Sequence, residues 1–438
     1  MTVDNIIIGA GPGGYELAAM LAATGESVVI IERDQLGGTC LNRGCIPTKC
    51  LCATADALSA VSRAAAFGVT AQVQAFDYSV ARQRVDSVVN NLRSGIEYQL
   101  SGVQIVRGEG KLLTSTTVAV GDDTYTASKR IVIATGSTTA RLPIPGADLC
   151  IDSTDVLAMD SLPASMVIIG GGVIGMEFAS IMNTFGVKTT VVEFCPEVLP
   201  MIDADIAKRL RQQLSRQGID FKVGAAVTAV ARVDDNTLCV SADTKKGAVT
   251  IEAEKVVMAV GRRPVVPQGT AKVGIELDRR GFIVVDENMC TSVPGIYAIG
   301  DVNGKSMLAH SAIAQGRVIA LGDPMAFNAG CVPSVVFTSP EVATVGTNAS
   351  SLDSAGIPYK VVKHQFSSNG KANAEGHTDG LVKMLVADDD TILGITILGH
   401  HAADLIAEAT VLVTDHVKHT DVARRYIHAH PTLSEIFL

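Results

Sequence analysis

Apolar runs and a glycine-rich turn alternate at the start of the chain. An apolar run from Val3 to Ile8 leads into Gly-Ala-Gly-Pro-Gly-Gly at 9–14, an Ala- and Leu-rich stretch, and a second apolar run that ends at Glu32. Short apolar runs bounded by turn residues are typical of buried strands, and the longer stretch between them is typical of a helix. Residues 3–32 therefore predict a strand, a turn, a helix and a strand in that order.

The same pattern recurs over residues 166–193. An apolar run that begins at Met166 is followed by Gly-Gly-Gly-Val-Ile-Gly at 170–175, a helical stretch and a run that ends at Glu193. In both copies the acidic residue lies 18 positions after the last glycine. A G-x-G-x-x-G sequence within a βαβ unit indicates a dinucleotide site, and its duplication indicates two such sites.

Glycines at these spacings let backbone N–H groups approach a pyrophosphate at the start of a helix, where the helix dipole favours negative charge. Glu32 and Glu193 are expected to accept hydrogen bonds from adenosine ribose hydroxyls. A carboxylate at Glu193 repels the 2′-phosphate of NADP, so the second site is predicted to prefer NAD. The spacing does not decide which dinucleotide each site holds, and a glycine turn without a ligand is the alternative. The glycines concerned are Gly9, Gly11, Gly14, Gly170, Gly172 and Gly175.

The rest of the chain gives coarser predictions. Residues 331–438 mix strands with helices and carry no nucleotide motif, so they are candidates for oligomerisation or for completing an active site. At 438 residues the chain has room for about three domains of roughly 150 residues each. The other expected elements are helices at 51–66, 78–100 and 402–418, short strands within 101–135, and strands at 256–261, 296–301, 381–386 and 392–398.

Composition and charge narrow the classes of partner. The chain is 47% hydrophobic and carries a net charge of −9, which argues against nucleic acid and anionic membranes because both attract clustered Lys and Arg. No apolar run is expected to approach the roughly 20 residues needed to span a bilayer. Residues 1–4 lead straight into the first strand and do not resemble a cleavable leader. We therefore expect a cytoplasmic protein with mostly reduced thiols.

Nine cysteines form an odd count over a long chain, which disfavours a secreted disulfide framework. One pair, Cys40 and Cys45, lies in the segment 37–49, shortly after the first nucleotide unit. Residues five apart on a regular helix have Cα atoms roughly 8–9 Å apart, beyond the ~7 Å limit for a disulfide. A bridge between them therefore requires a distorted turn, which Gly44 and Pro47 could supply.

Alternatives to this pair remain open. Cys50 lies five positions beyond Cys45, with Cys52 close by, so a different pairing is possible. It ranks lower because it would cross Pro47 and lie away from the glycine-rich entry. A zinc site that combines these cysteines with Cys40 ranks lower still. The remaining cysteines are expected to be isolated thiols.

Four segments resemble those of the pyridine nucleotide–disulfide oxidoreductase family, and the resemblance covers essentially the whole chain. The most specific are the cysteine segment at 37–49, Ala-Thr-Gly at 134–136, Gly-Asp at 300–301 and His-Ala-His-Pro-Thr-Leu-Ser-Glu at 428–435. Within the family the likeness is greatest to the enzymes that oxidise dihydrolipoamide with NAD⁺. It implies an α/β fold with two Rossmann-like dinucleotide-binding domains and a C-terminal α+β dimerisation domain.

The resemblance also implies how the chain is divided. The FAD-binding domain would occupy residues 1–140 and, as a second part, 263–330. The NAD-binding domain would occupy 141–262, and the dimerisation domain 331–438. FAD then belongs to the first glycine motif and NAD to the second.

Residue roles follow from the same resemblance. Cys45 would face the flavin, Cys40 would exchange with the substrate, and Lys49 would lie beside the flavin, paired with Glu177. A dithiol needs a base near the exchange cysteine, and histidine is suited to this near neutral pH. The other residues implied to bind cofactor are Thr135, Gly136, Gly261 and Asp301, the last of which would hold the ribityl chain of the flavin.

His430, oriented by Glu435, is the implied base, and it would reach the active site of the partner subunit in a homodimer. The expected reaction begins when a dithiol deprotonated by His430 attacks a Cys40–Cys45 disulfide at Cys40. Electrons would then pass from Cys45 through FAD to NAD⁺. Other histidines, His428 among them, are expected to be surface or packing residues.

Three departures from the family pattern leave the substrate open. Arg43 lies between the cysteines where an aliphatic residue is common, and its charge could favour the nearby thiolate. Val265 stands where Asn is frequent, and the chain ends at Leu438, soon after Glu435. Lipoamide, possibly carried on a 2-oxoacid dehydrogenase complex, is the expected substrate. The alternatives are an NADH-dependent reductase of another disulfide or oxidant, and a flavin-binding assembly subunit or redox sensor.

Overall fold

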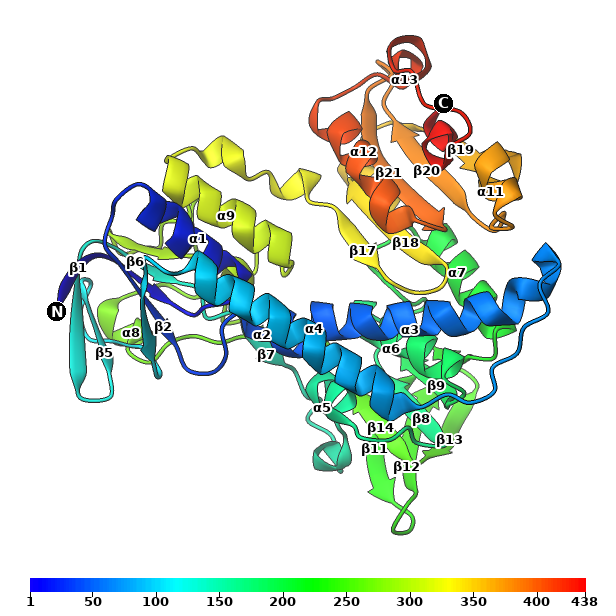
Figure 1. The fold of residues 1–438 in the computed structure, drawn as a ribbon, viewed down its shortest axis with the longest axis horizontal. Coiled ribbons are helices and arrows are strands. Elements are labelled where there is room, and N and C mark those ends of the chain that lie inside the picture. The colour runs from blue at the N-terminus through cyan, green and yellow to red at the C-terminus, as the bar shows by residue number, and fades with distance from the viewer. The chain divides into compact units, whose positions relative to one another are not determined.

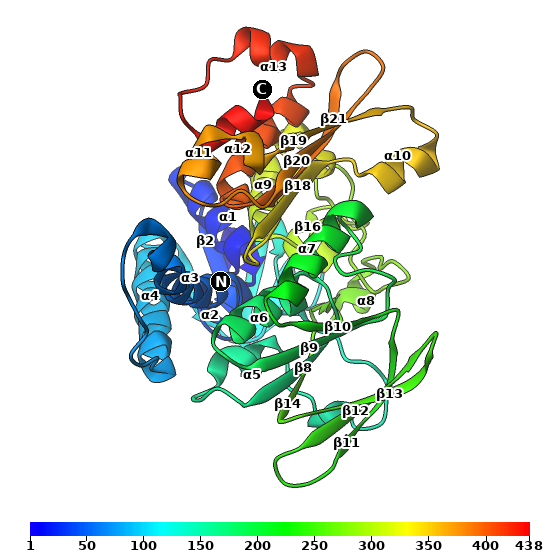
Figure 2. The same ribbon diagram turned by 90° about the vertical axis from the view of Figure 1, so that its right-hand side faces the viewer.

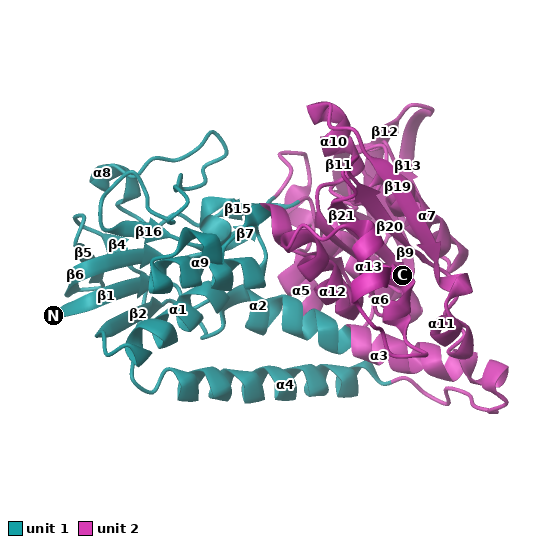
Figure 3. Cartoon of the chain, turned by 90° about the horizontal axis from the view of Figure 1, so that it is seen from above, with its two compact units in different colours: residues 1–51, 77–140, 261–329 teal, residues 52–76, 141–260, 330–438 magenta.

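A computed structural model describes all residues, 1–438, and Figures 1 and 2 trace the chain in two views. The chain divides into two compact units, which are coloured separately in Figure 3. Unit 1 comprises residues 1–51, 77–140 and 261–329, and unit 2 comprises residues 52–76, 141–260 and 330–438. Each unit is therefore assembled from segments that lie far apart in the sequence.

Unit 1 is built on a seven-stranded sheet with the order β3-β2-β1-β6-β5-β4, in which β16 also pairs with β6. The predicted first βαβ unit is confirmed: β1 (Thr2–Ile8), α1 (Pro12–Ala23) and β2 (Val28–Glu32) follow one another, and Ile6 lies opposite Val29 in a parallel pair. The other strands of this sheet are β3 (Gln104–Arg107), β4 (Lys111–Leu112), β5 (Thr117–Val120), β6 (Asp123–Ile133) and β16 (Ile296–Ala298).

The long strand β6 joins the two kinds of pairing in this sheet. Its first half pairs antiparallel with β5, and its second half runs parallel to both β1 and β16, with Ile131 opposite Ile6 and Ile296. This places the turns after β1, β6 and β16 at one edge of the sheet, where ligands of α/β proteins bind. Helix α9 (Ala309–Leu321) packs along α1 (Figure 1).

Four further α-helices and a small two-stranded sheet also contribute to unit 1. The short helix α2 (Gly38–Arg43) is followed directly by α3 (Cys45–Arg63), whose second half belongs to unit 2, and α4 (Tyr78–Gln99) is the longest helix of unit 1. Strand β7 (Ser137–Thr139) pairs antiparallel with β15 (Arg262–Pro264), and α8 (Thr270–Val273) follows.

Unit 2 contains the second βαβ unit in a parallel sheet of order β10-β9-β8-β14. Strand β8 (Ser165–Ile169), helix α6 (Val173–Thr184) and strand β9 (Lys188–Glu193) confirm the predicted repeat. An antiparallel meander of three strands is formed by the residues between the last two strands of this sheet in the sequence. The remaining elements of this part are α5 (Ser153–Ala158), α7 (Ala204–Arg216), β10 (Asp220–Val223), β11 (Ala226–Arg232), β12 (Leu238–Thr244), β13 (Gly247–Ala253) and β14 (Lys255–Met258).

The C-terminal part of unit 2 is an antiparallel five-stranded sheet of order β17-β18-β21-β20-β19 (Figure 2). Helix α12 (Ala402–Thr414) packs against β18 and β21 over a continuous apolar core. The helix is shorter than the predicted 402–418, because His416 adopts a left-handed conformation with φ 52°. The other elements are β17 (Ser334–Val336), β18 (Glu341–Gly346), α10 (Ala349–Ala355), β19 (Lys360–Gln365), α11 (Gly370–Ala374), β20 (Leu381–Val386), β21 (Ile392–Gly399) and α13 (His419–Arg425).

Two Rossmann-like sheets and a C-terminal α+β sheet confirm the predicted fold class. One helical stretch bears on the expectation that no apolar run could span a membrane. By length and composition alone the helical stretch Gly38–Phe67 is apolar enough to cross a membrane, with a mean hydropathy of 1.2 over its best window. A single stretch of this kind is weak evidence for a span, because helices of soluble proteins and signal sequences meet the same criterion.

A buried ion cluster ties α7 to the C-terminal sheet within unit 2. The Lys383 side chain is 6% exposed, and its Nζ lies 2.9 Å from Asp203 Oδ2 and 2.8 Å from Asp205 Oδ1. Asp203 is itself buried, and its Oδ1 also accepts a hydrogen bond from the backbone N–H of Ala349. Removing one partner of a buried ion pair leaves the other charge uncompensated in the interior.

We expect the substitution Lys383→Met to lower the free energy of unfolding by about 3–5 kcal/mol, the usual cost of breaking a buried ion pair. Lys363→Met is the matched control, because Lys363 contacts the same Asp205 at 2.7 Å but is 41% exposed. An exposed pair contributes at most about 1 kcal/mol. The chain has no Trp, so urea unfolding is best followed by circular dichroism. Equal losses in the two variants would contradict this account.

Candidate active site

The first glycine turn leaves open space at the start of α1. A Cβ atom added to Gly14 would lie 2.0 Å from the carbonyl oxygen of Gly9, so this position requires glycine for close packing of the helix on the turn. A Cβ added to Gly11 would meet no atom within 4 Å, so this side of the turn is open. Open backbone at a helix N-terminus fits a pyrophosphate.

The carboxylate of Glu32 is held against this turn by two backbone hydrogen bonds. Ala10 N–H donates to Glu32 Oε2 at 2.7 Å, and Asp34 N–H donates to Oε1 at 2.8 Å. Burial raises the pKa of Glu32, while the hydrogen bond from Ala10 opposes that shift. Both oxygens are therefore fixed in place, with lone pairs left for the hydroxyls of a ribose.

The second glycine turn repeats this construction in unit 2. Glu193 Oε2 accepts from Gly171 N–H at 2.5 Å, and its Oε1 accepts from Cys195 N–H at 2.6 Å. A Cβ at Gly175 would lie 2.0 Å from the carbonyl oxygen of Gly170, and a Cβ at Gly172 would meet nothing within 4 Å. The two predicted nucleotide sites thus share one backbone and one carboxylate geometry.

The cysteine segment begins directly on the first glycine turn. Gly37 N–H donates to the carbonyl oxygen of Ala10 at 2.8 Å, and a Cβ on Gly38 would lie 2.8 Å from Gly11 Cα. Helix α2 therefore starts in contact with the turn that fits a pyrophosphate. Cys40 lies on this helix, two residues after Gly38.

The helix breaks between the two cysteines, as a bridge between them requires. Helix α2 ends at Arg43, Gly44 has φ −148° and ψ −115°, and α3 begins at Cys45. A Cβ on Gly44 would lie 2.9 Å from the carbonyl oxygen of Thr39, so the break also depends on glycine for space. The predicted distortion is confirmed at Gly44, whereas Pro47 lies within the first turn of α3.

The break brings the Cys40 and Cys45 side chains into hydrogen-bonding contact. The hydrogen bond to Cys45 raises the pKa of the Cys40 thiol, burial raises it further, and the charge of Lys49 opposes both effects. Cys50 is instead buried, and the Cys52 Sγ donates to the carbonyl oxygen of Phe337 at 3.6 Å. No group of three or more His, Cys, Asp or Glu residues is arranged to hold a metal ion, which leaves the zinc alternative without support.

Arg43, which lies between the two cysteines, has a carboxylate partner. Its guanidinium forms an ion pair with the carboxylate of Asp34. The carbonyl oxygen of Asp34 also accepts a hydrogen bond from Arg107. The charge of Arg43 is thus compensated on the side of Asp34 and is not reserved for the thiols.

Asp301, predicted to hold the ribityl chain of the flavin, lies in a hydrogen-bonded network at the edge of the unit 1 sheet. Its Oδ2 accepts from the hydroxyl of Ser137 at 2.5 Å, and that hydroxyl accepts from Arg262 Nε at 2.7 Å. Thr135 donates to the carbonyl oxygen of Val265 at 2.5 Å, next to Gly136. Ser137 and Arg262 were not predicted, because single polar residues next to a glycine motif have no distinctive spacing.

His430 and Glu435 are joined directly in unit 2. His430 Nδ1 lies 2.9 Å from Glu435 Oε1, and Glu435 Oε2 accepts from Thr432 N–H at 2.9 Å. The hydrogen bond from Thr432 lowers the pKa of Glu435, and His430 lowers it further. The His430 side chain is 79% exposed, so its ring is oriented at one nitrogen and open at the other.

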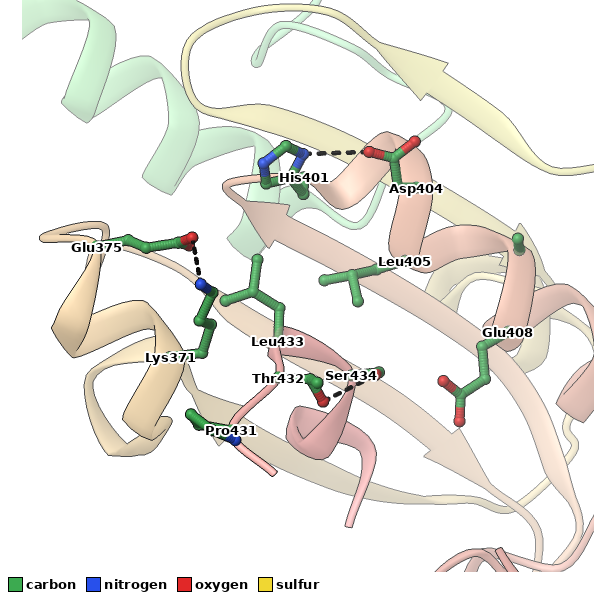
Figure 4. A pocket seen from close by; sticks show the side chains of 11 residues that line it. Lys371, Glu375, His401, Asp404, Leu405, Glu408, Pro431, Thr432, Leu433 and Ser434 are labelled. Atoms are coloured by element: carbon green, nitrogen blue, oxygen red, sulfur yellow. Dashed lines mark hydrogen bonds and ion pairs between the residues drawn. The ribbon is translucent and has the colours of Figure 1, made fainter. Parts of the chain in front are cut away.

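A surface pocket of about 550 Å³ is lined in part by residues 431–434, which lie between His430 and Glu435 in the sequence (Figure 4). It is lined from α11, α12 and the segment that follows His430. Glu408, on its wall, lies 2.6 Å from His428 Nε2 within hydrogen-bonding distance, and the His428 side chain is only 7% exposed, as expected for a packing residue. The labelled lining residues are Lys371, Glu375, His401, Asp404, Leu405, Glu408, Pro431, Thr432, Leu433 and Ser434.

Lys49 and Glu177 belong to different compact units, so their pairing stays a prediction. Glu177 is buried on α6, and its Oε1 accepts from Phe337 N–H at 3.0 Å. Gly261 has φ 120° and accepts from Ala140 N–H at 2.9 Å, at the point where the chain returns to unit 1.

Two family models match the chain. The model of the pyridine nucleotide-disulphide oxidoreductase matches residues 3–316. The model of the dimerisation domain of the same family matches residues 332–438. Together they account for nearly the whole sequence.

Similar proteins of known name support the same assignment. The chain is 38% identical to the dihydrolipoyl dehydrogenase of Chlamydia muridarum, over 99% of this chain and 95% of that protein. It is 36% identical to the dihydrolipoyl dehydrogenase of Geobacillus stearothermophilus, over 99% and 94%. Among solved structures, the HOCl-induced flavoprotein disulfide reductase RclA from Escherichia coli, in its Cu(II) complex, is 28% identical with a TM-score of 0.87, covering 100% of this chain and 99% of that one.

The arrangement of the thiols predicts which disulfide forms. Trypsin cuts after Arg43 and Lys49, so Cys40, Cys45 and the pair Cys50 and Cys52 fall on three separate peptides. After mild oxidation and alkylation of free thiols, we expect mass spectrometry to find peptide 34–43 linked to 44–49. Cys50 should be alkylated only after unfolding, because it is buried. A link from Cys45 to the peptide that starts at Cys50 would contradict the geometry.

Proposed function

This chain belongs to the pyridine nucleotide-disulphide oxidoreductase family, and we propose that within it the protein oxidises dihydrolipoamide to lipoamide with NAD⁺. Membership makes it a flavoprotein oxidoreductase that uses FAD and NAD(H). One observation supports the assignment of the working thiols: Cys40 and Cys45 meet across the break at Gly44, on a segment that packs against the first glycine turn.

The residues of unit 1 fit FAD. The open side of the turn at Gly11 would receive its pyrophosphate, Glu32 its ribose, and Asp301 with Ser137 its ribityl hydroxyls. Bound there, FAD supplies a two-electron acceptor between thiols and nicotinamide. Gly170, Gly172, Gly175 and Glu193 in unit 2 would bind NAD by the same geometry. In this proposal the FAD-binding domain comprises residues 1–140 and 263–330, the NAD-binding domain residues 141–262, and the dimerisation domain residues 331–438.

The chain's own residues carry the sulfur and proton steps. A substrate thiolate attacks the Cys40 sulfur of the disulfide. A bond forms between the substrate sulfur and Cys40, the Cys40–Cys45 bond breaks, and Cys45 leaves as a thiolate. The second substrate thiol then displaces Cys40, so that substrate is oxidised and the couple is reduced. His430 would take the substrate proton at Nε2, because Nδ1 is engaged by Glu435. In this proposal Lys49 lies beside the flavin and pairs with Glu177.

The site would be completed in a homodimer, in which His430 of each subunit serves the thiols of the other. The match of residues 332–438 to a dimerisation domain and the exposure of His430 support this arrangement. A lipoyl group carried by a 2-oxoacid dehydrogenase complex would be the natural source of substrate, and the cytoplasm the expected location.

A second function, reduction of another disulfide or of an oxidant by NADH, is favoured by one observation. The structure superimposes on the disulfide reductase RclA over its full length with a TM-score of 0.87. The two reactions use the same thiols, and they differ in the substrate and in the direction of electron flow.

Steady-state assays separate these functions. We expect rapid reduction of NAD⁺ by free dihydrolipoamide, followed by the absorbance of NADH. His430→Gln should lower kcat by about 10²–10⁴-fold, the usual contribution of a general base. His401→Gln is the matched control and should leave kcat unchanged, because His401 also has a carboxylate partner, Asp404 at 3.1 Å, but no proposed role.

Loss of NADH only with a different acceptor would replace the first function by the second. The absence of turnover with either kind of substrate would rule out both functions. The remaining function would then be that of a flavin-binding assembly subunit or redox sensor. Equal effects of the two histidine substitutions would remove His430 from the mechanism.

The two nucleotide carboxylates give a paired prediction. Replacement of Glu32 by Gln leaves an amide N–H facing a backbone N–H, so the first turn should lose its flavin on dilution. Glu193→Gln should weaken NADH binding and reduce the preference for NADH over NADPH. Each effect should be about tenfold or more, since a hydrogen bond to a charged group contributes about 1.5–3 kcal/mol. The bound flavin content and the affinity for NADH are measured on both variants, so that each variant is the control for the other. Loss of flavin in Glu193→Gln, or weaker NADH binding in Glu32→Gln alone, would refute the assignment.

A further inference from the structure

The amide of Asn42, between the two cysteines, is fully engaged. Its Nδ2 donates to the carbonyl oxygens of Leu36 at 2.9 Å and Gly38 at 2.8 Å. Its Oδ1 accepts from Arg93 twice, from Nε at 3.2 Å and from Nη2 at 2.6 Å. Asn42 therefore joins the start of α2 to its end and connects both to a helix 51 residues away in sequence.

Groups on both sides of this amide determine its orientation. An amide can be turned about its axis with little change in shape, and neighbouring groups determine which atom is oxygen. A guanidinium only donates, so the Asn42 oxygen must face Arg93 and its NH₂ must face the carbonyls of the segment. Without Arg93 the NH₂ keeps its two carbonyl acceptors, but the oxygen loses both hydrogen bonds that it accepts.

Arg93 is itself held on α4. Its Nη1 donates to Asn90 Oδ1 at 3.0 Å, one turn earlier on the same helix. The guanidinium is thus forked between Asn90 and Asn42, a geometry that the single ammonium of lysine does not reproduce. All of these contacts lie within unit 1.

We propose that Arg93 is a positioning residue for the Cys40–Cys45 couple, acting through Asn42. This rests on the proposed function in one respect, that these two cysteines are the redox couple. A disulfide needs its two Cα atoms within a narrow range of separations, about 4.4–6.8 Å. By fixing α2 before the break at Gly44, Asn42 and Arg93 hold Cys40 within reach of Cys45 and stabilise the disulfide relative to the dithiol.

The test is the redox equilibrium of the couple in the purified holoenzyme. Wild type, Arg93→Ala, Arg93→Lys and Asn42→Ala are equilibrated in dithiothreitol buffers of known ratio and quenched by alkylation. The linked peptides 34–43 and 44–49 are then quantified against their alkylated forms. Arg82→Ala is the matched control, because Arg82 lies on the same helix and pairs only with Asp86, at 3.3 Å.

We expect the disulfide of Arg93→Ala to be reduced about tenfold more readily, a shift of about 30 mV toward a less negative potential. Arg93→Lys should shift in the same direction, and Arg82→Ala should match wild type. The double variant of Arg93 and Asn42 should shift no further than Asn42→Ala, since both substitutions remove one interaction. A structural role alone would change thermal stability without moving this equilibrium.

An unchanged equilibrium in Arg93→Lys, or additive shifts in the double variant, would overturn the inference. Arg93→Lys keeps the charge and the aliphatic stem, so it provides the answer if the alanine variant does not fold. Failure of the proposed function is distinguishable, because it would show in the wild type as an absent link between the two peptides before any substitution is made.

Discussion

The break in helix geometry at Gly44 is the constraint on which the sulfur chemistry depends. In a continuous helix residues 40 and 45 would be roughly 8–9 Å apart at Cα, too far for a disulfide. The chain ends α2 at Arg43 and restarts at Cys45, and the two thiols meet. Such a break needs external support, since an isolated helix of six residues is not stable in water. The support comes from the glycine turn on one side and from Asn42 and Arg93 on the other.

The same logic governs both nucleotide sites. In each site, both oxygens of the carboxylate at the end of the second strand accept hydrogen bonds from backbone N–H groups. One of these groups belongs to the glycine turn, and the other belongs to the residue two positions after the glutamate. The turn and the carboxylate thus fix one another before any ligand arrives, which reduces the ordering needed on binding. That this geometry occurs twice, in separate units, explains why the repeat is visible in the sequence.

The features that the sequence predicted depend on interactions between residues close in the sequence, and those that it missed depend on interactions between distant residues. The glycine motifs, Glu32, Glu193 and the need for a distorted turn near Gly44 were predictable, because each depends on spacing within about thirty residues. The Arg93–Asn42 and Arg262–Ser137–Asp301 contacts were not, because they join residues 51 to 164 positions apart and have no period. The ion pair of Arg43 with Asp34 was likewise not predicted.

The proton balance of the couple explains why a separate base is needed. The hydrogen bond between the sulfurs raises the pKa of Cys40, so once one thiol of the reduced pair has ionised, loss of the second proton is opposed. The couple that an incoming dithiol attacks is moreover the disulfide, which has no thiolate to take the proton of that dithiol. That proton requires a separate base that is open to solvent. In the proposed mechanism this base is His430, whose side chain is 79% exposed and whose Nδ1 is oriented by Glu435, which Thr432 holds in turn, so that Nε2 is left for the transfer.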